Sequence, residues 1–115
     1  MINVESIKER YLKDELSIRL GGLAANLARI RSIVVNPASR AATASLIEES
    51  KYFIEWAAPE APLETQVVLV EIQLRLAQWE KMLGEYWDED AQRQELSLNA
   101  KSWSDQVLEL SGLLN

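Results

Sequence analysis

Carboxylates are the only side chains in this 115-residue chain that could carry catalysis. The sequence contains no cysteine and no histidine, so it offers no thiolate nucleophile, no imidazole base and no Ser-His-Asp triad. The lack of histidine also excludes the di-iron sites that four-helix proteins build from Glu-x-x-His elements. No glycine-rich phosphate loop is present. The remaining candidates are acidic: Glu48, Glu49, Glu55, Glu80, Glu85, Asp88, Glu89 and Asp90.

Two acidic elements, Glu48-Glu49 and Glu85-x-x-Asp88, offer the oxygen ligands that Mg²⁺ prefers. They resemble in part the Glu-Glu-x-x-Glu and Glu-x-x-Asp elements of the all-α nucleotide pyrophosphohydrolases. Tyr52 stands where the third acid of the first element belongs, and the two elements are far apart in the chain. The resemblance implies a Mg²⁺-dependent hydrolase as the alternative function. The favoured interpretation is that these acids form solvated helix faces and a turn, with no catalytic residue, metal or cofactor.

Three arginines, Arg29, Arg31 and Arg40, gather around a predicted turn between helices. Asn36 is a suitable N-cap and Pro37 a suitable first residue for the helix that follows. Arginines beside a helix start form a generic anion site, which could take a phosphate or an acidic segment of a partner. The favoured alternative is that these are surface arginines that pair with acidic helices.

The charge balance argues against nucleic acid as a partner. Twelve basic residues stand against 18 acidic ones, a net charge of −6. Residues 1–40 hold 7 basic and 4 acidic side chains and residues 41–115 hold 5 and 14, as expected for a basic helix beside acidic ones. The longest uncharged run, 20–28, is far too short for a membrane span, and the N-terminus lacks the features of a signal peptide. The sequence therefore predicts a cytoplasmic protein without membrane contact.

The spacing of apolar residues predicts helices throughout, since no segment alternates in the manner of a strand. We expect helices over about 4–35, 37–58 and 63–87, and a fourth that follows a turn at 88–90 and ends near 114. Short links between amphipathic helices favour an all-α, antiparallel up-down-up-down four-helix bundle, formed as one domain by residues 1–115. The expected core series are Leu16, Leu20, Leu23, Leu27, Ile30 and Val34; Ala42, Leu46, Phe53 and Ala57, flanked by Ile47 and Ile54; Leu69, Ile72, Leu76, Trp79, Leu83 and Tyr86; and Leu96, Ala100, Trp103, Val107, Leu110 and Leu114.

The turn at 88–90 is inferred from phase. Continuing the third apolar series would place Asp90, Arg93 and Ser97 on the core face, whereas the fourth series is out of step by three residues. The alternative is a single helix of about 50 residues within an oligomer, with the slip absorbed as a stammer.

Two helices carry more apolar surface than one bundle core requires. In the first helix the early apolar residues lie on the side opposite to the later ones, and at about 1.5 Å per residue this helix overhangs the others. The third helix carries a second stripe as well. We therefore predict a homodimer whose interface comprises Val4, Ile7, Tyr11, Ile18, Val67, Val70 and Leu74. In the alternative, the first helix bends at Gly21-Gly22 or near Asp14 and folds back on its own bundle.

Small residues flank the main stripe of the first helix at Gly21, Ala24 and Ala28. We expect them to admit a neighbouring helix closely, and a slot for a small apolar ligand, with Ala100 as its far wall, is the alternative. The missing catalytic groups and the apolar surplus together predict a non-enzymatic protein–protein interaction module, such as a small regulatory, adaptor or assembly protein.

Overall fold

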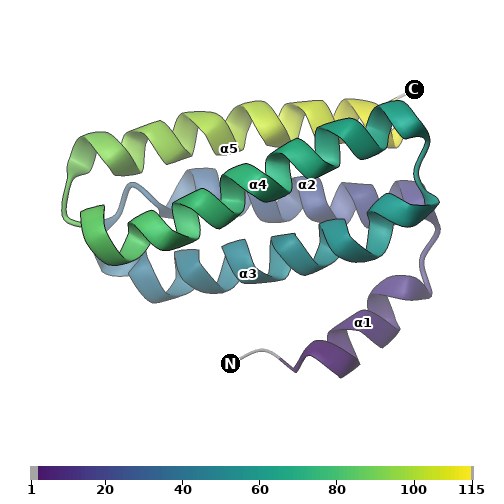
Figure 1. Ribbon diagram of the computed structural model, residues 1–115, viewed down its shortest axis with the longest axis horizontal. Coiled ribbons are helices and arrows are strands. Elements are labelled where there is room, and N and C mark those ends of the chain that lie inside the picture. The colour runs from purple at the N-terminus through teal and green to yellow at the C-terminus, as the bar shows by residue number, and fades with distance from the viewer. Residues whose placement is uncertain (1–2, 115) are drawn as a thin grey trace.

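The computed structural model describes residues 3–114, and within that range it is built of helices without strands (Figure 1). The all-α prediction is therefore confirmed. Two short 3₁₀ turns, Pro37–Ser39 and Ala58–Glu60, precede α3 and α4. The α-helices are α1 (Val4–Leu12), α2 (Leu16–Ile33), α3 (Arg40–Ala57), α4 (Leu63–Tyr86) and α5 (Asp90–Ser111).

The four longer helices, α2 to α5, pack around a shared core, and each runs opposite to the one before it (Figure 1). Helix α2 packs against α5 and α3, while α4 packs against α3 and, more lightly, α5. The shorter α1 lies beside α3 on the outside of this group. The predicted four-helix architecture is thus corrected to one of five α-helices in the described residues. None of these helices has the length and apolar character that crossing a membrane requires.

The predicted first helix is broken between Leu12 and Leu16. The amide of Lys13 donates to the carbonyl of Arg10 and closes the last turn of α1. Glu15 has extended backbone angles, φ −63° and ψ 157°, so the chain changes direction before α2 begins. The overhanging helix is therefore wrong, and the bend near Asp14 is the alternative that occurs. The break falls where the apolar stripe changes sides, because each half then turns its own stripe inward.

The other helix boundaries follow local capping. The side chain of Asn36 accepts the amide of Ala38 and caps the 3₁₀ turn that begins at Pro37, so the α-helix starts only at Arg40. The turn between α4 and α5 is confirmed, with Glu89 extended at the α5 N-cap. Helix α5 ends sooner than predicted because Gly112 adopts φ 78°, a left-handed conformation that suits glycine.

The core confirms most of the predicted series and corrects one of them. The buried face of α3 consists of Thr43, Ile47, Ser50, Ile54 and Ala57, together with Phe53. Ala42, predicted to be core, is exposed. The polar residues Thr43 and Ser50 occupy the inner face, so the buried face begins one position later than the apolar spacing indicated. At the series ends, Tyr86 and Leu114 are exposed rather than buried.

The small residues of α2 admit α5 closely, as predicted. A Cβ placed on Gly21 would lie 2.6 Å from Cδ1 of Leu113, so only glycine fits there without a shift. One turn further on, the hydroxyl of Ser104 donates to the carbonyl of Ala24 at 2.8 Å. Leu113 occupies the space beside Gly21 that a ligand slot would need.

Candidate interaction surface

The outer side of α4 carries a row of exposed apolar side chains, here called the α4 outer row. It consists of Leu63, Val67, Val70 and Leu74, whose exposed fractions are 77, 61, 47 and 63 %. Their 4-3-4 spacing places them on one face of the helix. Together with Gln66 and Glu71 they line a shallow surface groove. The exposed fractions place this row on the surface formed by residues 3–114, and Figure 1 draws no helix in front of α4.

Helix α4 has this row because it is apolar on two sides in its first half. Its inner series, which includes Leu69, Ile72 and Leu76, is buried in the bundle core. The outer row points the other way and cannot reach that core. Leu63 belongs to the row but was not among the predicted interface residues. The signal was present in its spacing of four residues from Val67.

Charged residues lie along both halves of α4. Glu64 and Glu71 lie in the first half of the helix, and both are exposed. Arg75 and Lys81 follow in the second half and are exposed as well. Glu71 is four residues before Arg75, so these two charges lie on the same flank of the row. The second half also carries the exposed Glu80 and Glu85, so acidic and basic side chains are mixed there, and only the first half is uniformly acidic.

The predicted interface residues before α3 behave differently from those of α4. Tyr11 is buried and stacks on Phe53 of α3, with ring centroids 4.0 Å apart and planes 7° from parallel. Ile7 is partly buried and packs against the same core, and Val4 is partly exposed. Ile18, at the start of α2, remains exposed. The predicted set is thus divided between an internal contact of α1 and the exposed α4 outer row.

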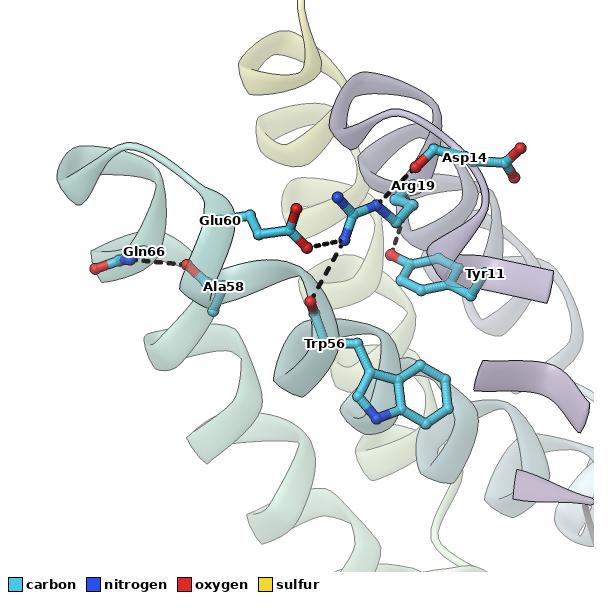
Figure 2. A network of polar contacts seen from close by, with 7 residues as sticks. All are labelled: Tyr11, Asp14, Arg19, Trp56, Ala58, Glu60 and Gln66. Carbon is cyan, nitrogen blue, oxygen red and sulfur yellow. Dashed lines mark hydrogen bonds and ion pairs between the residues drawn. The ribbon is translucent and has the colours of Figure 1, made fainter. Parts of the chain in front are cut away.

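A buried arginine holds the fold-back of α1 in place (Figure 2). The Arg19 side chain donates from Nε to the carbonyl of Asp14 at 3.1 Å. One terminal nitrogen donates to the carboxylate of Glu60 at 2.8 Å and, at 3.4 Å, to the carbonyl of Trp56. The backbone carbonyl of Arg19 accepts the hydroxyl of Tyr11 at 2.8 Å. Arg19 thus joins the α1–α2 link to the C-terminal end of α3 and to the 3₁₀ turn that follows it.

The environment of this network changes the ionisation of two of its members. Burial raises the pKa of Tyr11 above its ordinary value of 10.0, with the positive charge of Arg19 acting in the opposite direction. The hydrogen bond from Arg19 lowers the pKa of Glu60. Sequence reasoning missed Arg19, because its carbonyl partners become neighbours only after α1 has folded back.

A second buried arginine, Arg93, lies in the first turn of α5. It donates to the carbonyl of Trp87 and to the carboxylate of Asp90, and its guanidinium carbon lies 5.6 Å from the centre of the Trp87 ring. We expected a core-facing Arg93 only if the preceding helix ran on through residue 93, and took this as evidence for a turn. Arg93 is instead the first member of the α5 series, stabilised at the edge of the core by its own turn.

The predicted anion site consists of exposed residues. Arg29, Arg31 and Arg40 are all on the surface. Arg40 reaches towards the end of α4, where its guanidinium lies 4.0 Å from the Cβ position of Gly84. The anion site thus remains a prediction that rests on three exposed charges.

The acidic residues of the alternative hydrolase site are not brought together. Glu49 lies in the middle of α3 and accepts a hydrogen bond from Asn26 at 2.9 Å. Glu85 lies in the last turn of α4, and Asp88 lies in the connection between α4 and α5. Across residues 3–114 no three acidic side chains are grouped so that they could hold a metal ion.

Comparisons with known proteins place the chain in no family. No protein-family model matches it, and no match was found among curated proteins or among solved structures. The function proposed below therefore rests on the surface and packing of this molecule.

Proposed function

We propose that this protein is a non-enzymatic protein–protein interaction module, of the kind that serves as a small regulatory, adaptor or assembly protein. The α4 outer row is its docking surface, and the observation that carries the proposal is the exposure of four large apolar side chains on one helix face. Contiguous apolar surface of this kind is typical of sites where proteins meet. The homodimer and the cytoplasmic location predicted from the sequence belong to the same proposal.

The size of the row suits a modest affinity. Covering each of its side chains contributes on the order of 1 kcal/mol or more, at about 25 cal/mol per Å² of apolar area. Flanking contacts from Gln66, Glu71 and Arg75 extend the surface at its edges. Because association costs several kcal/mol of lost freedom, only part of this gain remains as binding free energy, and the complex should be weak.

Affinity capture with two matched variants tests the proposal. The tagged chain is expressed with a second, differently tagged copy, and bound proteins are recovered and re-tested in purified form. Val70→Glu places a charge in the centre of the α4 outer row, whereas Leu98→Glu places one at an exposed leucine of α5, 70 % accessible. We expect Val70→Glu to abolish a purified complex that Leu98→Glu retains.

Two results would overturn the proposal: equal binding by the two variants, or no direct complex with any purified partner or second copy. Both substitutions are at exposed positions, so circular dichroism and melting temperature should be close to those of the unmodified chain. Agreement in these controls shows that any loss of binding arises at the surface.

A further inference from the structure

We propose that two copies of this chain exchange their α1 helices. The link at residues 13–15 straightens, α1 and α2 become one continuous helix, and α1 of each copy occupies the site on α3 of the other. The product is a domain-swapped dimer. This inference goes beyond the proposed function, because it concerns the contact between α1 and α3 and does not use the α4 outer row.

The link between α1 and α2 interrupts a segment that is otherwise suited to a helix. Residues 4–20 contain neither glycine nor proline. Lys13 has helical backbone angles, φ −72° and ψ −23°. At Glu15 φ is −63°, already a helical value, and only ψ, at 157°, departs from the helical value of about −42°. Glu15 therefore becomes helical by rotation about one of its two backbone bonds.

The start of α2 gains hydrogen bonds when the helix is continuous. The first amides of a helix have no partner inside it, and within the described part of the chain the Glu15 side chain does not cap them. In a continuous helix the amides of residues 16–18 donate to the carbonyls of residues 12–14. Arg10 and Asp14, four residues apart, then form a pair of opposite charge across the former break. Local interactions thus favour the straight form.

The apolar residues on the two sides of the link are in phase with a continuous helix. Val4, Ile7, Tyr11 and Ile18 follow one another at spacings of 3, 4 and 7, so they share one face when residues 4–33 form one helix. The fold-back separates them, because Tyr11 is buried against α3 while Ile18 is 49 % exposed. The continuous helix carries this stripe away from its own α3, so the stripe needs a second surface.

The surface that fits the stripe is the site on α3 that α1 occupies in the single chain. There Tyr11 stacks on Phe53 and donates its hydroxyl to the carbonyl of Arg19. After an exchange each copy makes these contacts with α1 of the other, so nothing in the site has to be rebuilt. The dimer gains the hydrogen bonds of the continuous helix and loses the freedom of two separate molecules, so it should form at high protein concentration.

Cross-linking between two differently labelled chains tests the exchange. Because the chain has no cysteine, a single one can be introduced at a chosen position. Arg10 and Glu49 line the same groove between α1 and α3, so one preparation carries Arg10→Cys and the other Glu49→Cys. The two are mixed at about 0.5 mM, warmed to near the melting temperature, cooled and diluted. They are then treated with a bis-maleimide chosen because it links both sites within one dilute chain that carries both cysteines.

We expect covalent dimers that contain one chain of each kind. The matched control replaces Glu49→Cys by Glu95→Cys, at an exposed glutamate of α5, and should give few such dimers. Val70→Glu in both preparations should leave the yield unchanged.

Substitutions in the link should change the association constant in opposite directions. Glu15→Pro suits the folded-back chain, because Pro62 has nearly the same angles, φ −58° and ψ 153°, at the N-cap of α4. Since proline disrupts a helix interior in each copy, it should weaken the dimer more than about a hundredfold. Asp14→Ala, which favours helix, should strengthen it about fivefold. If Glu15→Pro lowers the melting temperature, Glu15→Gly replaces it, with an expected loss of about fivefold.

Three results would overturn the exchange: no mixed dimers from chains with the natural link, equal yields with Glu49→Cys and Glu95→Cys, or equal yields for the two link variants. A yield that falls with Val70→Glu overturns it as well, and assigns the association to the α4 outer row. Failure of the exchange by itself leaves the proposed function standing, because that function is tested by the Val70→Glu capture experiment.

Discussion

The inner face of α1 and the outer face of α4 have the same apolar pattern in the sequence but different fates in the structure. Ile7 and Tyr11 of α1 are packed against the chain's own core. Val70 and Leu74 of α4 are exposed. The comparison separates an apolar stripe that completes a fold from one that remains available to another molecule.

The difference arises from what each stripe can reach. A short link at residues 13–15, in which Glu15 is extended, changes the direction of the chain so that Tyr11 of α1 meets Phe53 on α3. Helix α4 is connected to α3 and α5 and packs against both. It cannot rotate its outer row inward without exposing Leu69 and Ile72. The stripe on α1 is thus covered by the chain itself, whereas the second stripe on α4 stays exposed.

The largest expected effect is on the α1 contact. Tyr11→Ala removes the stack on Phe53 and the hydrogen bond to the Arg19 carbonyl, and it should lower the free energy of unfolding by about 3 kcal/mol. Urea unfolding measures the loss, and hydrogen exchange should show α1 amides that have lost protection. Unchanged protection in α1 would mean that Tyr11 does not hold this helix in place.

Arg19→Met should lower the free energy of unfolding by about 2 kcal/mol. The substitution keeps most of the side-chain volume but leaves the carbonyls of Asp14 and Trp56 without their donor. Urea unfolding of this variant beside Arg29→Met, at an exposed arginine of the same helix, isolates the network. Equal stability of the two variants would show that the network contributes nothing.

Alkaline pH should reduce the stability of the α1 contact. The pKa of Tyr11 is raised in the folded protein, mainly by burial, so above pH 10 the unfolded chain releases a proton that the folded chain retains. Stability is then lost by about 1.4 kcal/mol per pH unit above 10. Tyr11→Phe, less stable at neutral pH by about 1 kcal/mol, lacks this loss. Urea unfolding from pH 8 to 11 should show the two curves converging, and parallel curves would contradict a buried phenol.

The smallest effect on folding is expected at the α4 outer row. Leu74→Ala should change the free energy of unfolding of the monomer by no more than about 0.5 kcal/mol, because the side chain is 63 % exposed. Urea unfolding of the dilute protein measures this change, and Leu76→Ala, at a buried position of the same helix, shows the size of a core loss for comparison. A loss at Leu74 comparable to that at Leu76 would mean that the outer row is part of the core after all.

Helix content and most core residues followed from the sequence. The apolar spacing of α2, α4 and α5 specified which residues are buried, because a helix with one dominant stripe has one way to face a core. The prediction was wrong in part at α3, where Thr43 and Ser50 occupy inner positions and Ala42 is exposed, and it was wrong for the straight first helix. Among the candidate interface residues, the sequence indicated Val67, Val70 and Leu74, which are exposed, but missed Leu63.

By itself the sequence determined that helices form, which stripe of each is dominant, and that neither cysteine nor histidine chemistry is available. Only the tertiary structure decided which surplus apolar residues are covered and that Arg19 is buried among backbone carbonyls. The physical reason is that apolar spacing is a local property of the sequence, whereas burial is decided by long-range contacts. The spacing of apolar residues shows which side chains favour burial. Whether the same chain buries them depends on contacts between segments far apart in the sequence, such as Tyr11 with Phe53.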